Sequence, residues 1–155
     1  GRLSPTDFIA VNLSGKAISE GKPSAETKLH TQLYARFASI GAVLHCHSSA
    51  ATVLSRAIAG NILTLSNYEL LKAFAGIDTH AVSVDIPIFD NTQDIAGLAE
   101  EVDRYLIAHP QCPGYLIRGH GVYCWAVDLE ACMRNLEALD FLMQCELEHL
   151  RLAGV

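Results

Sequence analysis

The sequence lacks long hydrophobic runs, an excess of basic residues and any C-x-x-C pair. No apolar segment approaches the roughly 18 residues of a membrane-spanning helix, and no signal-peptide pattern opens the chain. The formal net charge of −6 argues against a nucleic acid or an anionic membrane as the partner. An anionic small substrate is still allowed, because a metal and a few local donors can override a diffuse negative field.

Cysteine usage and missing motifs narrow the class further. The five cysteines are odd in number, so neither a disulfide framework nor a cysteine zinc site is indicated. We expect reduced thiols in a cytoplasmic protein. The sequence also has no P-loop, no dinucleotide fingerprint and no G-x-S-x-G nucleophile motif.

Size and patterning predict a single α/β domain over residues 1–155. Half of the 155 residues are apolar, which is enough for a core. The chain starts at Gly1 without a methionine and runs directly into Arg2-Leu3-Ser4-Pro5, so we expect an upstream segment to be missing from this sequence. Helical and strand-like segments alternate along the chain, as in a layered α/β domain.

The predicted elements follow from hydrophobic period and from turn residues. We expect a hairpin around residues 8–16 and a late interruption of one strand by Pro87. The expected helix caps are Ser24, either Ser48 or Ser49, and Asp128. The predicted helices cover about residues 25–39, 49–58, 68–74, 93–109 and 129–152, and the predicted strands cover 42–47, 62–65, 80–89, 115–118 and 122–126.

The strongest chemical signal is a pair of histidines on a predicted buried strand. His45 and His47 are two residues apart, which places both imidazoles on one face of the strand while Cys46 points to the other. Two neutral imidazole nitrogens on one face can bind the same ion. The plainer interpretation is two polar residues at a strand end, but two buried imidazoles side by side are an unusual way to fill a core.

A third histidine stands between two glycines. His120 follows the predicted strand 115–118, and its neighbours Gly119 and Gly121 allow a sharp turn and a close backbone approach. Alone, G-H-G indicates only a turn histidine. Combined with the H-x-H pair, it supplies the third ligand of a site that leaves positions open for substrate.

Two acidic residues need separate weighing. Glu26 and His30 are spaced i, i+4 on one predicted helix, so both could be metal ligands. Alternatively, Glu26 is a first-turn carboxylate that the helix dipole favours, and His30 is a packed core residue. For His30 we prefer this second interpretation. Glu69 lies in a short predicted helix and, by composition alone, is a surface acid.

Several longer motifs resemble the class II aldolase/adducin-like family, over nearly the whole chain. The histidine motifs mark the superfamily, and the remaining motifs resemble its dehydratase branch. The motifs are Pro23-Ser24-Ala25-Glu26, His30 to Tyr34, Ala42 to Ser48, Ala51 to Arg56, Tyr68-Glu69-Leu70, Pro87 to Asn91, Gln93-Asp94-Ile95 and Arg118 to Trp125.

The resemblance implies a metal-dependent lyase that acts on a small phosphorylated sugar. It implies a three-layer α/β domain with a central, largely antiparallel sheet flanked by helices, assembled as a homotetramer. It also implies one zinc ion per subunit on His45, His47 and His120. Iron, manganese or cobalt could use the same three imidazoles.

The resemblance also assigns the catalytic and phosphate-binding residues. In the dehydratases, a glutamate at the position of Glu69 serves as general acid/base, which reverses the composition-based interpretation. In the aldolases, the acid at the position of Glu26 has that role, so the division between the two stays open. Ser24 matches a phosphate-contacting serine, whereas an upstream Gly/Asn loop that helps to hold the phosphate in the family is absent from this sequence.

Two other functions stay open. A class II aldolase would break a carbon–carbon bond through the same metal chemistry, and its products would identify it. An adducin-like head would bind partners without chemistry, and such heads need not keep the three histidines that are present here.

Overall fold

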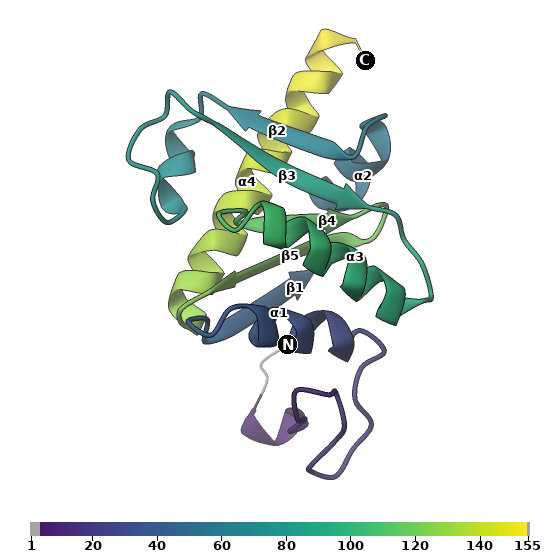
Figure 1. The fold of residues 1–155 in the computed structure, drawn as a ribbon. Helices are drawn as coiled ribbons and strands as arrows, with labels where there is room; N and C mark the ends of the chain where they lie inside the picture. The colour runs from purple at the N-terminus through teal and green to yellow at the C-terminus, as the bar shows by residue number, and fades with distance from the viewer. Residues whose placement is uncertain (1–3, 155) are drawn as a thin grey trace.

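The computed structural model describes residues 4–154, so the expectation about the start of the chain at Gly1 lies outside it. Helices and strands alternate along this range (Figure 1), which confirms the α/β class. The strands are β1 Ala42–Cys46, β2 Ile62–Ser66, β3 Ser83–Phe89, β4 Gly114–Ile117 and β5 Gly121–Ala126. The α-helices are α1 Thr27–Arg36, α2 Ser49–Ala57, α3 Ile95–Ala108 and α4 Leu129–Ala153, with short 3-10 helices η1 Pro5–Asp7 and η2 Glu69–Ala73.

The strands of residues 4–154 form one five-stranded sheet in the order β1-β5-β4-β3-β2. Only β3 and β4 are parallel, and the other neighbouring pairs are antiparallel, as the family resemblance implies. Cys46 lies opposite Val122, Ile117 opposite Gly121, and Phe89 beside Ile117. The ends of β1, β3 and β4 and the start of β5 therefore lie at one end of the sheet, which we call the histidine end.

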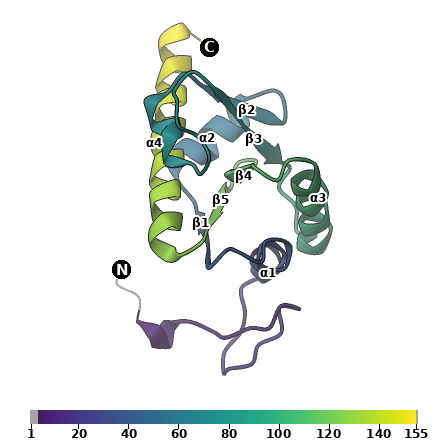
Figure 2. The same cartoon turned by 60° about the vertical axis from the view of Figure 1, so that its left-hand side comes forward.

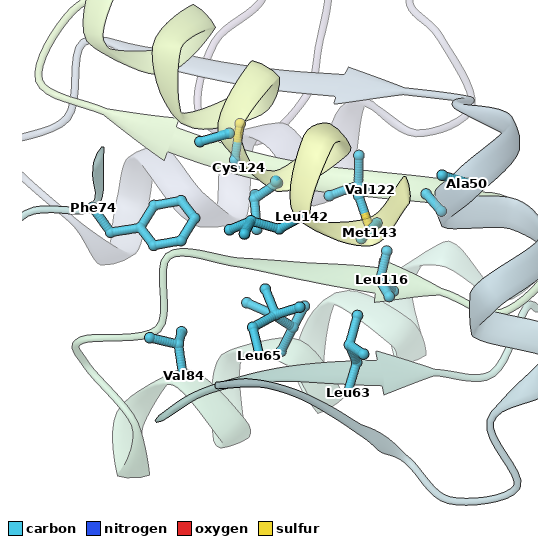
Figure 3. Close-up of a cluster of buried hydrophobic side chains, with 14 of the residues drawn as sticks. Ala50, Leu63, Leu65, Phe74, Val84, Leu116, Val122, Cys124, Leu142 and Met143 are labelled. Atoms are coloured by element: carbon cyan, nitrogen blue, oxygen red, sulfur yellow. The ribbon is translucent and has the colours of Figure 1, made fainter. Parts of the chain in front are cut away.

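Helices cover both faces of the sheet, which makes the domain three-layered (Figure 2). The helices α2 and α4 pack on one face, where their side chains form a buried cluster with Leu63, Leu65 and Leu116 (Figure 3). The helices α1 and α3 pack on the other face, around Tyr115 and Tyr123. Because side chains alternate along a strand, the central strands contribute to both clusters.

Three local expectations were not met in full. The chain turns back over residues 14–16 as expected, but the hairpin has only one bridge, between Val11 and Ala17, because Phe8 and Leu13 stay exposed and give the two arms no apolar face to bury. Pro87 does not interrupt β3, which runs on to Phe89 and pairs with β4 only at its last two residues.

The third is the cap of α1. The residue at the cap position is Glu26, whose side chain makes no capping bond, and Ser24 Oγ instead accepts a hydrogen bond from the Glu26 amide at 3.2 Å. The expected caps of α2 and α4 are confirmed: Ser48 and Asp128 each accept a bond from the third residue after them. Within the described residues, no helix is both long and apolar enough to cross a membrane.

Candidate metal centre

The H-x-H pair lies at the histidine end of β1, on the face covered by α1. His45 is opposite Tyr123 in the β1–β5 register, and its imidazole stacks on the Tyr123 ring at 4.1 Å between centroids. His47 follows the last strand residue, and its ring lies 4.6 Å from that of His45. Cys46 packs against the cluster on the opposite face, beside α2 and α4. The two imidazoles therefore share one face, as the period of two predicts.

The turn between β4 and β5 brings His120 to the same place. Gly119 has a φ of +67°, a left-handed conformation that glycine adopts without a steric penalty. A Cβ on Gly121 would lie 2.3 Å from the carbonyl oxygen of Cys46, so only glycine allows β5 to approach β1 this closely. Both flanking glycines thus have the roles expected from the sequence.

Helix α2 anchors this turn. The amide of Gly119 donates to Ser55 Oγ at 3.0 Å, and the Thr52 hydroxyl donates to the carbonyl oxygen of His120 at 3.0 Å. Arg118, just before the turn, uses all five guanidinium donors: it bonds Asp90, Asn61 and the carbonyl oxygens of Ser55, Ile58 and Gly60. The position of His120 is therefore fixed by a network of hydrogen bonds to the turn.

Four side chains converge at this point: the three histidines and Glu26, from the start of α1. One potential ligand atom from each lies within 4.8 Å of all the others. His120 Nε2 lies 2.9 Å from His47 Nε2 and 3.0 Å from Glu26 Oε1, and His45 Nε2 lies 3.3 Å from Glu26 Oε2. Within residues 4–154 this is the one such group of histidine, cysteine and acidic side chains.

The donor set fits a divalent metal ion. His45 Nδ1 lies 3.0 Å from the carbonyl oxygen of Val122, which can accept only from a protonated nitrogen, so the lone pair of His45 is on Nε2. That Nε2 atom is buried and, among the described residues, has no hydrogen-bond partner. Ligands of a tetrahedral zinc ion with bonds of about 2.0–2.1 Å lie roughly 3.3 Å apart, close to the distances within this cluster.

Burial tunes the groups around the cluster. Burial lowers the pKa of His45, which favours the neutral imidazole that a metal requires. Burial also lowers the pKa of His30, whose ring lies edge-on to Tyr123 at 5.3 Å rather than within the cluster. The Tyr123 hydroxyl donates to Glu26 Oε2 at 2.7 Å, and burial followed by this bond raises the pKa of Tyr123 well above its ordinary value.

Glu69 is far from the cluster in the same chain. It begins η2, three residues after β2. In the sheet, β2 is the edge strand farthest from β1 (Figure 1), and it ends opposite the histidine end. The four strand spacings between β1 and β2 alone amount to roughly 19 Å. Glu69 is exposed and pairs with Lys72, whose hydrogen bond lowers the pKa of the Glu69 carboxyl, and with His80 at 3.6 Å.

Ser24 lies two residues before Glu26, and its hydroxyl oxygen accepts from the Glu26 amide. The hydroxyl proton remains available to a ligand approaching the start of α1, where exposed amides favour anions. The structure thus brings Glu26 to the three histidines, keeps Ser24 two residues away in the sequence, and leaves Glu69 apart.

Sequence reasoning gave no role to Tyr123, Thr52 or the side chain of Arg118. Tyr123 could have been found from the strand period, because it shares its face with Trp125 and lies three residues after His120. The contacts of Thr52 and Arg118 with the β4–β5 turn join segments more than 50 residues apart, and no local pattern encodes them.

A cluster that could hold a metal ion, at the end of a mixed sheet between two helical layers, is typical of metal-dependent enzymes of the α/β class. The chain belongs to the class II aldolase and adducin N-terminal domain family, whose sequence model matches residues 1–147. The family resemblance seen in the motifs is thereby confirmed.

Curated relatives give a narrower likeness. The chain is 56% identical over 154 residues to the methylthioribulose-1-phosphate dehydratase of Pseudomonas aeruginosa strain PAO1, covering 99% of this chain and 75% of the relative. It is 52% identical over 155 residues to the enzyme of the same name from Azotobacter vinelandii, with the same coverage of 99% and 75%.

Solved structures confirm the fold. The L-fuculose-1-phosphate aldolase of Thermus thermophilus superposes with a TM-score of 0.74 at 23% identity, over 99% of this chain and 75% of that one. An aldolase II superfamily protein from Pseudomonas syringae gives a TM-score of 0.66 at 18% identity, over 92% of this chain and 54% of that one. At these identities the likeness extends to the fold alone.

Proposed function

We propose that this chain is a zinc-dependent hydro-lyase that removes water from 5-methylthioribulose 1-phosphate. The product is 2,3-diketo-5-methylthiopentyl 1-phosphate, and the reaction is a step of methionine salvage. The observation that carries the proposal is the convergence of three imidazoles and one carboxylate in a chain that is 56% identical to a methylthioribulose-1-phosphate dehydratase. The five free thiols favour the reducing cytoplasm as its location.

His45, His47 and His120 would hold the metal, one ion per subunit. When bound, the ion supplies Lewis acidity, which makes the substrate C–H bond beside the carbonyl more acidic and stabilises negative charge on the adjacent oxygens. Val122 fixes the tautomer of His45 through the bond to Nδ1, so that Nε2 faces the cluster. The turn anchored by Thr52 and Ser55 holds His120 in place.

Glu26 and Ser24 are the groups of this chain that would meet the substrate first. Glu26 Oε1 is directed into the cluster and can accept a proton from a carbon placed there. Ser24 would donate its hydroxyl proton to the substrate phosphate, next to the first amides of α1.

Dehydration needs two proton transfers: one proton leaves carbon, and one is given to the departing hydroxyl. We assign the first transfer to Glu26 and the second to Glu69. One chain cannot bring Glu69 to its own cluster, because the two lie on opposite edges and at opposite ends of the sheet. We therefore propose that Glu69 serves the cluster of a neighbouring subunit in a homotetramer. A head-to-tail contact of this kind repeats around a closed ring.

Mixed oligomers test this arrangement. His47→Ala removes a metal ligand, and Glu69→Gln removes the acid/base, so each variant alone is inactive while Glu69→Gln still binds zinc. When the two variants are refolded together in equal amounts, about one quarter of the sites combine an intact cluster with an intact Glu69, so activity returns to about that fraction.

The outcomes are distinct. Mixed oligomers that stay inactive would place Glu69 in the same chain as its cluster or outside the reaction. Full activity of Glu69→Gln alone would remove it from the mechanism and leave Glu26 as the acid/base. Glu26→Gln is the matched control. Mixed with His47→Ala it should stay inactive, because Glu26 and His47 belong to the same cluster and an intact Glu69 from another subunit cannot replace either.

A class II aldolase is the second candidate, favoured by the position of Glu26 inside the cluster while Glu69 lies outside it. Product analysis separates the two, because an aldolase releases an aldehyde and dihydroxyacetone phosphate or its analogue, whereas the dehydratase forms a diketone. If the chain is instead a non-catalytic adducin-like head, the purified protein should be folded and contain no metal.

The first experiment is elemental analysis of the purified protein together with turnover of methylthioribulose 1-phosphate. About one zinc per chain and formation of the diketone support both the site and the reaction. Zinc without turnover keeps the metal centre and redirects the substrate search to the aldolase class. Folded protein that takes up no metal contradicts the proposal.

A further inference from the structure

Tyr123 links a histidine of the cluster to Glu26. It is a fully buried residue of β5, and its ring lies nearly parallel to the His45 imidazole, with 18° between the planes. Its hydroxyl donates to Glu26 Oε2 at 2.7 Å. The phenol therefore contacts both groups without itself being one of the converging ligands.

The two oxygens of the Glu26 carboxylate have different surroundings. Each oxygen lies beside a cluster histidine, Oε1 at 3.0 Å from His120 Nε2 and Oε2 at 3.3 Å from His45 Nε2, but of the two only Oε2 accepts the Tyr123 hydroxyl. A carboxylate only accepts hydrogen bonds, so the phenol must be the donor in this pair. A charge-assisted bond of this kind is stronger than a neutral one and has a preferred direction.

We propose that Tyr123 is a positioning residue that reserves Oε2 of Glu26, so that Glu26 presents only Oε1 to the metal and to the substrate. The inference rests on the proposed metal centre and is independent of which sugar phosphate the enzyme takes. Its direct consequence is that Glu26 acts through a single oxygen.

Removal of the hydroxyl frees the second oxygen. In Tyr123→Phe the ring still packs on His45, but Oε2 loses its donor in a part-buried place where the nearest ring nitrogen, Nε2 of His45, carries a lone pair. With a divalent ion present, the free oxygen gains most by turning to the ion. The carboxylate would then bind through both oxygens, which would raise the coordination number of the ion by one.

Cobalt(II) replaces zinc as the probe, because the intensity of its visible d–d bands falls when the coordination number rises. Tyr123→Phe is expected to bind cobalt with weaker bands than the wild-type protein. Turnover should fall about 10- to 100-fold in kcat with little change in KM, as is typical when a residue that orients a metal-site group is removed.

Tyr115→Phe is the matched control. Tyr115 is equally buried and stacks on Tyr123 at 4.9 Å, but among the described residues its hydroxyl has no hydrogen-bond partner. Loss of that hydroxyl should leave the cobalt spectrum and kcat unchanged. A second test uses Glu26→Ala, in which the additional change Tyr123→Phe should have no further effect on the spectrum.

The outcomes separate this inference from the proposed function. A wild-type protein that binds no cobalt overturns the metal centre itself. A wild-type protein that binds cobalt, with a Tyr123→Phe spectrum identical to it, overturns only the role of Tyr123. Equal changes in Tyr115→Phe and Tyr123→Phe also overturn it, because they would indicate general loosening of the core.

Discussion

Replacement of Arg118 by lysine should destabilise the fold, although it keeps the charge. The guanidinium donates five hydrogen bonds, and its Nη1 atom alone bonds the carbonyl oxygens of Ser55 and Ile58 at 2.7 and 3.1 Å. A lysine ammonium has three donors in a compact group and cannot span the same acceptors. At least two acceptors therefore lose their partner.

The expected cost follows from that count. A lost intramolecular hydrogen bond costs on the order of 1 kcal/mol, so Arg118→Lys should lower the free energy of unfolding by about 2 kcal/mol. The bond to Asp90 adds little to this, because that carboxylate is mostly exposed. Since Arg118 directly precedes the turn that carries His120, zinc affinity should fall as well.

Urea unfolding at a fixed protein concentration, without metal, measures the first effect. Arg151→Lys is the control, because Arg151 makes an exposed pair with Glu148 one turn away, and its replacement should change stability by less than about 0.5 kcal/mol. If Arg118→Lys behaves like this control, the hydrogen bonds of Arg118 do not stabilise the region as we argue.

Three further changes have defined outcomes. Gly121→Ala should cost about 1–3 kcal/mol in thermal unfolding, because its Cβ would collide with the Cys46 carbonyl oxygen; a neutral effect would mean that β5 can shift away from β1. Excess zinc at about 100 times its dissociation constant should stabilise the wild-type protein by about 2.7 kcal/mol, an increase that His47→Ala should lack; equal stabilisation of both would place the ion elsewhere. Arg36 lowers the pKa of Asp103 below its ordinary 3.8, so this pair stabilises the fold above that pH and the contribution disappears as the pH falls through the lower folded value. Asp103→Asn should therefore be destabilised, by less than about 1 kcal/mol, near pH 7 and match the wild type in strong acid; a difference that grew on acidification would contradict this sign.

Hydrophobic period was sufficient for most of the fold. The helices after residue 48 carry continuous apolar stripes and polar caps such as Ser48 and Asp128, and their positions were predicted to within a few residues. The N-terminal hairpin is shorter than predicted because strand-like residues pair stably only where one face is buried, and burial depends on the rest of the molecule.

The site was predictable only where local geometry dictates it. The spacing of His45 and His47 fixes a shared strand face, and the glycines beside His120 indicate a close approach. By contrast, nothing near Glu26 or Glu69 says how far either lies from the histidines, since that distance depends on how helices and strands pack. The family resemblance assigned roles to both residues, but only the structure separates their positions.

The distances along the chain between the converging residues have a consequence for folding. His45 and His47 are contributed by a segment more than 70 residues from His120, and all five cysteines are free thiols. An ion held by them would act as a reversible cross-link between the first third of the chain and the β4–β5 turn. In the chain-entropy treatment used for disulfides, closing a loop of this length removes about 4–5 kcal/mol of unfolded-state entropy. Metal supply would then govern how long the folded chain survives as well as whether it turns over substrate.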